Sequence, residues 1–198
     1  MGISIDEIKK LKELTGVGLT DAKVALTEAG GDFDKALEAM RKKGLTKAEK
    51  RGEREARQGL IEAYVHSGRI GVLVELNCET DFVAKTEEFK ALAHDIAMQV
   101  AAMSPKYISE ADIPEEEKLR KEAELIEAAK NTGKSEEIAK KAVIGQMNKY
   151  FAELTLVKQA YWKDDTLTIE DLVKNHIAKL GENIVVRQME RIELGVSE

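Results

Sequence analysis

The chain has 198 residues, enough for one ordinary domain or for a small domain followed by a larger one. Its 37 acidic residues outnumber its 31 basic residues, and a net charge of −6 argues against a dedicated nucleic-acid-binding protein. No apolar stretch approaches the roughly 20 residues of a transmembrane helix, and the sequence opens on a charged amphipathic segment instead of a signal peptide. A single cysteine, Cys78, excludes an internal disulfide and fits a reducing compartment. These features predict a soluble cytoplasmic protein with no membrane or direct nucleic-acid contact.

The first 44 residues predict three short helices. The first begins at a capping box formed by Ser4 and Glu7. Apolar side chains then recur along one face of it: Ile5, Ile8, Leu11 and Leu14. Thr20 or Asp21 is expected to cap the second helix, and the third is expected to stop at Gly44. Helices of this length share only a small core, which is typical of a ubiquitin-associated-type bundle.

Residues 41–57 differ in charge from the rest of the chain. They hold eight Lys and Arg residues against three Glu, so this segment carries +5 and the remainder −11. A contact with a polyanion and a solvated, mostly helical linker would both explain this pattern. No aromatic residues interleave with the charges to stack on bases, which favours the linker. The sequence therefore predicts residues 1–54 as a helical module plus basic linker, and residues 55–198 as a second domain.

Residues 55–198 mix strands with helices. Leu60–His66 and Val72–Cys78, joined by a Ser-Gly-Arg turn, predict an antiparallel hairpin, and Asn183–Leu194 predicts a third strand of the same sheet. Four apolar residues of that third strand are expected on one face: Ile184, Val186, Ile192 and Leu194. Because strands and helices segregate along the chain, the predicted class is α+β, with a three-stranded antiparallel sheet packed against helices.

Helix boundaries in this region are marked by caps and breakers. Thr86 is the expected cap of a helix that ends before Pro105, and a further helix is expected from Ile169 to Leu180, ending at Gly181. The inner face of the first of these consists of Phe89, Leu92, Ala93, Ile96 and Val100. A helical hairpin is predicted over about 114–151.

Enzyme, metal and cofactor motifs are incomplete. Gly133-Lys134-Ser135 resembles the end of a phosphate-binding loop, but the required glycine is replaced by Ala128. The three histidines have no metal-ligand spacing, and Cys78 has no local His or Asp to activate it as a nucleophile. The sequence therefore predicts a protein that is not an enzyme and that holds neither a metal nor a cofactor.

One apolar residue stands in a turn, where apolar residues are uncommon. Phe82 lies in the polar segment Glu79–Lys85, between the predicted hairpin and the helix capped by Thr86. The ring could be tucked under its own loop, or it could be a rigidly mounted wedge beside a carboxylate, aimed at a partner.

Four segments of the chain together resemble the bacterial elongation factor Ts family in its short form. They are LKELTGVGLTDAKVAL (11–26), VELNCETDFVAKTEEF (74–89), LVKQAYWKD (156–164) and GENIVVR (181–187). The chain departs from the family at Gln159-Ala160-Tyr161, where Gln-Pro-Phe is usual, which leaves the path of that segment open. It also carries one core subdomain where long members carry two.

The resemblance implies a guanine nucleotide exchange factor that binds elongation factor Tu and promotes GDP release. By this resemblance Phe82 would be the inserted side chain and Asp81 its polar companion, with Thr80 and Val83 fixing the turn. Residues that match the family's docking surface for the GTP-binding domain are Leu11, Val17, Gly18 and Leu19. For Leu11, packing in the helical core is an equal alternative.

The resemblance to short members also implies a symmetric homodimer, because a single core subdomain needs a second protomer to present an equivalent surface. Cys78, at a strand end, would then lie near the dimer contact. A competing hypothesis is a ubiquitin-associated-like adaptor that binds helices through residues 1–44, with the remainder serving as a dimeriser.

Overall fold

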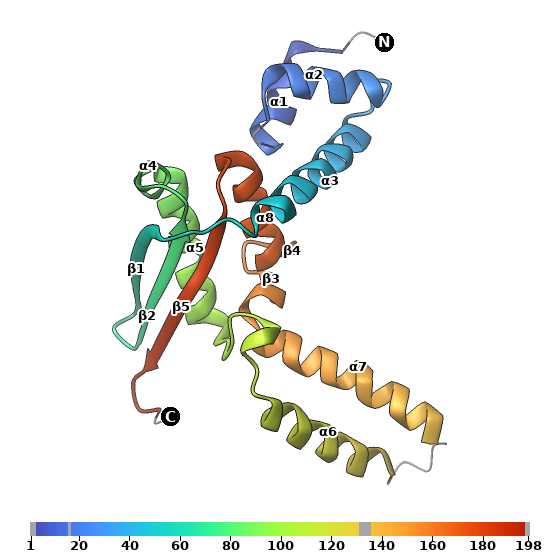
Figure 1. Ribbon diagram of the computed structural model, residues 1–198, viewed down its shortest axis with the longest axis vertical. Coiled ribbons are helices and arrows are strands. Elements are labelled where there is room, and N and C mark those ends of the chain that lie inside the picture. The colour runs from blue at the N-terminus through green and yellow to red at the C-terminus, as the bar shows by residue number, and fades with distance from the viewer. Residues whose placement is uncertain (1–2, 16, 131–135, 197–198) are drawn as a thin grey trace.

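The structure is a computed structural model that describes residues 3–15, 17–130 and 136–196. Three parts follow one another along its longest axis: an N-terminal helical module, a sheet covered by helices, and a helical hairpin that projects away from both (Figure 1). This arrangement confirms the predicted α+β class. In the described part of the chain, no helix is both long and apolar enough to cross a membrane.

The N-terminal module is built around a small apolar core. Its helices are α1 (Ile5–Thr15), α2 (Leu19–Glu28) and α3 (Phe33–Arg51). The buried side chains are Leu11, Ala22, Ala25, Leu26, Ala36 and Met40. The capping box is confirmed, because the Ser4 amide donates to the Glu7 carboxylate at 2.9 Å and the Glu7 amide donates to Ser4 Oγ at 3.1 Å. Of the predicted stripe only Leu11 is fully buried, and Ile5 and Leu14 are exposed.

Two predicted boundaries in this module are wrong. The N-cap of α2 is Gly18, without a side-chain cap, so Thr20 and Asp21 lie inside the first turn. Helix α3 does not stop at Gly44 but continues to Arg51, whose guanidinium donates to the carbonyl of Ile177 at 3.2 Å. One glycine in a helix interior costs only about 1 kcal/mol, which this long-range contact can offset. The domain division near residue 54 remains a prediction.

The sheet has three antiparallel strands in the order β1-β2-β5. They are β1 (Gln58–His66), β2 (Ile70–Cys78) and β5 (Ile184–Glu193). The ladder between β2 and β5 changes register, because Leu76 faces Val186 whereas Glu75 faces Gln188. Arg187 is therefore an extra residue, and this β-bulge exchanges the two faces of β5 beyond it. The prediction that Ile192 shares a face with buried Ile184 is consequently wrong, and Ile192 is 75% exposed.

Two helices cover the inner face of the sheet. Helix α5 (Glu87–Met103) begins at Thr86, whose hydroxyl accepts from the Phe89 amide, and its predicted inner face is buried. Helix α8 (Ile169–Leu180) ends at Gly181 as predicted. Between β2 and α5 the chain forms a single turn, α4 (Asp81–Ala84). The largest side chains of this core with at most 1% exposure are Leu76, Phe89, Leu92, Ile96, Leu156 and Ile169.

The projecting hairpin is confirmed, with helices that lie side by side (Figure 1). They are α6 (Glu115–Lys130) and α7 (Glu136–Leu154). Two short helices, η1 (Glu110–Asp112) and η2 (Leu156–Lys158), connect the hairpin to the core. A small two-stranded sheet, β3 (Ala160–Tyr161) and β4 (Asp164–Thr168), was not predicted. Its path is fixed by buried Gln99, which bonds the side chain of Gln159 at 3.1 Å and the amide of Trp162 at 3.0 Å.

Gly59 in β1 has no room for a side chain, and the structure predicts what replacing it would do. It has a φ of +153°, and an added Cβ would lie 2.1 Å from the carbonyl oxygen of Leu76. We expect Gly59→Ala to lower the free energy of unfolding by about 2 kcal/mol or more. Denaturant unfolding measures this. The control is Gly71→Ala in β2, where a Cβ meets nothing within 4 Å. Equal losses of unfolding free energy in the two variants would contradict the steric conflict at Gly59.

Candidate partner-binding site

Phe82 is held out into solvent. Its side chain is 80% exposed, although Ala84 in the same helical turn is buried. The turn begins at Thr80, the N-cap, whose Oγ1 accepts from the amide of Val83 at 3.5 Å. Because α4 runs directly from β2 into α5, both ends of the turn are anchored in the core. The structure thus overturns the reading in which the ring is tucked under its own loop.

The carboxylate beside Phe82 is ionised and paired. Asp81 Oδ2 lies 2.6 Å from the Nζ of Lys85, one helical turn away. The hydrogen bond and the positive charge of Lys85 lower the pKa of Asp81 below its usual value. Both side chains are largely solvated, so this pair contributes little to stability. The lowered pKa keeps the Asp81 carboxylate ionised next to the exposed ring.

Two turns that are distant in sequence, one of them at the start of α4, are joined by carboxylates. The amide and the hydroxyl of Thr80 donate to the two carboxylate oxygens of Glu182, at 2.9 and 2.6 Å. The amide of Asn183 donates to Glu79 at 2.7 Å. The sequence prediction assigned no role to Glu182 or Asn183. Pairing of β2 with β5 in the predicted sheet could have shown this contact, because it places the residues directly before β5 opposite those that follow β2.

The expected docking residues of the N-terminal module differ in exposure. Gly18 and Leu19 are exposed at the start of α2, and Val17 is partly buried against the module core. Leu11 is fully buried in that core. Core packing therefore explains Leu11, and its side chain is not presented to a partner. Helices α2 and α4 lie apart in the molecule, so Leu19 and Phe82 belong to separate surfaces (Figure 1).

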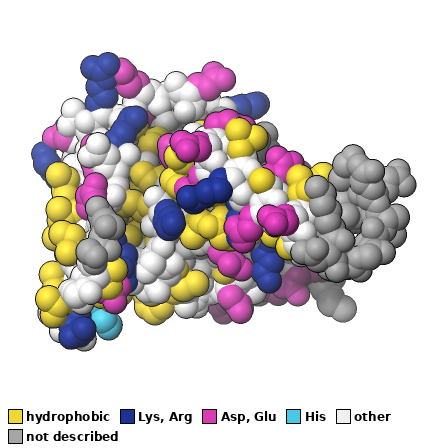
Figure 2. Space-filling model, turned by 90° about the horizontal axis from the view of Figure 1, so that it is seen from below, with side chains coloured by type: hydrophobic (Ala, Val, Ile, Leu, Met, Phe, Trp, Pro, Cys, Tyr) yellow, Lys and Arg dark blue, Asp and Glu magenta, His cyan; other side chains and the backbone are white. Residues whose placement is uncertain are grey.

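The outer face of the sheet carries exposed apolar side chains beside the polar residues Glu75, Gln188 and Glu190. Hydrophobic side chains gather on the side of the molecule where the β1–β2 hairpin lies (left in Figure 2). The exposed residues on or just beyond this face are Ile61, Val65, Leu73, Ile192, Leu194 and Val196. Cys78 points the other way, into the core, where its Sγ donates to the carbonyl of Thr80 at 3.1 Å. Its thiol is therefore not part of the exposed face.

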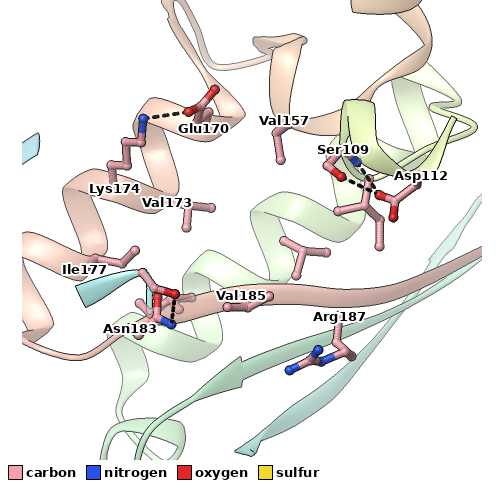
Figure 3. Close-up of a pocket in the computed structure, with 14 residues that line it drawn as sticks. Ser109, Asp112, Val157, Glu170, Val173, Lys174, Ile177, Asn183, Val185 and Arg187 are labelled. Atoms are coloured by element: carbon pink, nitrogen blue, oxygen red, sulfur yellow. Dashed lines mark hydrogen bonds and ion pairs between the residues drawn. The ribbon is translucent and has the colours of Figure 1, made fainter. Parts of the chain in front are cut away.

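A groove of about 680 Å³ lies between α8, β5 and η1 (Figure 3). Its walls are largely apolar, and the charged groups at its rim are engaged, with Lys174 bonded to Glu170 and Asp112 to Ser109. Across the described residues, no cluster of three or more His, Cys, Asp and Glu side chains could hold a metal ion. The candidate phosphate-loop residues Gly133-Lys134-Ser135 lie outside the described part of the chain.

Comparison with known proteins identifies close relatives. The family model described as "Elongation factor TS" matches residues 45–195. The curated Elongation factor Ts of Thermotoga petrophila is 52% identical over 196 residues, which cover 98% of this chain and 98% of that protein. The Elongation factor Ts of Moorella thermoacetica is 51% identical, with 98% of this chain and 96% of the relative covered. These relatives therefore have nearly the same length as this chain.

The burial of Cys78 predicts an unreactive thiol. Burial, with the nearby charge of Glu182, raises the pKa of Cys78 to about 11. At pH 8 only about one thiol in a thousand is then ionised, and the thiolate is the reactive form. We expect iodoacetamide to label the folded chain at least about 100-fold more slowly than the chain in guanidinium chloride. Rapid stoichiometric labelling of the folded protein would contradict this description of Cys78.

Proposed function

Because the chain belongs to the elongation factor Ts family of translation factors, we propose that it is a guanine nucleotide exchange factor that promotes GDP release from elongation factor Tu. The observation that carries the proposal is the 80% exposed ring of Phe82, mounted on a turn anchored at both ends. In this mechanism the ring, with ionised Asp81 beside it, inserts near the magnesium and phosphate site of the GTPase.

Exchange follows from linkage between two binding equilibria. If the factor binds the nucleotide-free GTPase more tightly than the GDP-bound form, it must weaken GDP binding by the same factor. A thousandfold faster release requires a barrier lower by about 4 kcal/mol. The contacts between a GTPase, its magnesium ion and the nucleotide phosphates are dense in charge and sensitive to geometry. A small displacement by an inserted ring can therefore supply this energy.

The mounting of Phe82 suits insertion. A side chain that must displace part of a partner transmits force only if its own backbone does not yield. At the start of the turn Thr80 is bonded to Glu182, and at its end Ala84 is buried. The ring is thus pre-organised, which reduces the conformational entropy lost on binding.

Docking through the N-terminal module would supply a second contact. Leu19 is exposed at the first turn of α2, next to the exposed backbone of Gly18. Two separate contacts on one partner raise the effective concentration of each. We assign affinity mainly to this module and nucleotide release mainly to Phe82.

The proposal includes a symmetric homodimer that forms through the outer face of the sheet. This face presents Ile61, Val65 and Leu73 to solvent. A cluster of exposed apolar side chains on a sheet is typical of a protein–protein interface. Two-fold symmetry would place the same face on both protomers and give the dimer two Phe82 tips.

The exchange proposal predicts that Phe82→Ala leaves the fold intact, because the ring makes few contacts in the free protein. GDP release from elongation factor Tu should slow at least tenfold, equivalent to about 1.4 kcal/mol of barrier. Release of labelled GDP, with and without the variant, measures this. The matched control is Ile144→Ala on α7, which truncates another exposed apolar side chain, 61% exposed. A Phe82→Ala variant that stimulates GDP release as well as the unmodified chain would contradict the proposal.

The dimer proposal predicts that a charge placed among the apolar side chains of the outer sheet face separates the protomers. Ile61 is 70% exposed, and in a symmetric dimer Ile61→Lys places two charges in one interface. We expect the dimer dissociation constant of this variant to rise at least about tenfold, measured by sedimentation equilibrium. Ile144→Lys serves as the control at a similar exposure. A monomeric unmodified chain at the concentrations used for exchange would refute the dimer.

A further inference from the structure

We infer that Glu182 is the positioning residue of the exchange tip, holding Thr80 so that α4 presents Phe82 in one orientation. The inference rests on the proposed function of Phe82. Glu182 does not lie at the tip itself and acts through Thr80, whose amide and hydroxyl it accepts at 2.9 and 2.6 Å.

The geometry arises because side chains continue the β2–β5 ladder after its backbone pairing ends. The last paired residues are Cys78 and Ile184. One step further along, the amide of Asn183 donates to the Glu79 carboxylate at 2.7 Å. One more step along, Thr80 meets Glu182. The antiparallel register thus places this carboxylate opposite the N-cap of α4.

The turn that carries Glu182 is itself fixed. Helix α8 ends at Gly181 in the left-handed conformation, with φ of +81°, which favours glycine there. On the other side, buried Asn183 donates through Nδ2 to the carbonyls of Gly52 at 3.3 Å and Arg54 at 2.7 Å. Glu182 therefore sits between two anchored residues, and its carboxylate is a pre-organised acceptor.

The chemistry of the contact selects a carboxylate. Thr80 presents two donors side by side, and an ionised carboxylate offers two acceptor oxygens and no donor. A glutamine amide would set an N–H group against one of these donors. Because the Thr80 hydroxyl donates to Glu182, its oxygen lone pairs remain available for the amide of Val83 within α4. The orientation of α4 thus depends on an acceptor 102 residues away in the sequence.

The test compares full-length Glu182→Gln with Glu170→Gln. Glu170, on α8, is a matched control, because it is also a partly buried carboxylate with hydrogen bonds, here from Lys174 and Lys158. We expect Glu182→Gln to lower the maximal rate of GDP release from elongation factor Tu about fivefold. The half-saturating concentration should stay within about twofold, because the docking module is untouched. Glu170→Gln should leave both values unchanged.

A double variant separates positioning from general destabilisation. If Glu182 acts through Phe82, adding Glu182→Gln to Phe82→Ala should slow release no further. Losses that multiply, or a normal maximal rate in Glu182→Gln, would overturn the inference. Thr80→Ser, which keeps the hydroxyl, should restore most of the rate that Thr80→Val loses, and equal rates for the two variants would also count against it.

Amide hydrogen exchange tests the positioning without reference to the GTPase. We expect Glu182→Gln to accelerate exchange at the Thr80 amide at least about tenfold, while the amides of β2 keep their protection. Unchanged protection at Thr80, or loss of protection throughout the sheet, would refute a positioning role. If the Phe82→Ala variant stimulates GDP release normally, the nucleotide-exchange proposal fails. The protection of the Thr80 amide in Glu182→Gln still decides whether Glu182 positions the turn.

Discussion

Strands β2 and β5 pair from Ile70 with Glu193 to Cys78 with Ile184, and this ladder decides which turns meet at its end. The turn after β2 carries Phe82, and the turn before β5 carries Glu182. A slip of one residue would move every side chain of a strand to the opposite face of the sheet. The buried face of β2 prevents such a slip, so packing in the core fixes a contact at the surface.

Local signals in the sequence were sufficient for most elements of the fold. A Thr at position 86 followed by apolar residues at helical spacing identified α5, and Gly181 identified the end of α8. These signals work because caps and periodicity act within a few residues. The two strands before α5 and the segment after α8 were assigned to one three-stranded sheet, and the structure agrees. The position of Phe82 in a polar turn singled it out, but the sequence left open whether its ring is buried or exposed.

The features that the sequence did not predict depend on distant residues. The bulge at Arg187 is a property of two paired strands, so the alternation in β5 alone placed Ile192 on the wrong face. The path of β3 is fixed by Gln99, some 60 residues away in sequence. Helix α3 passes Gly44 with support at its far end from α8. In each case the deciding contact lies outside the window in which sequence patterns are informative.

The continuity of α3 turns the connection between the two surfaces into a rod. Its 19 residues span roughly 28 Å at the rise of an α-helix. A flexible tether would let the N-terminal module search a wide volume, whereas a rod holds it at one distance and one rotation from the core. The length of α3 therefore sets the spacing of the two proposed contacts. Each residue inserted there would swing the module by about 100° around the axis, so in the proposed complex the length of α3 would limit which partners can meet both contacts at once.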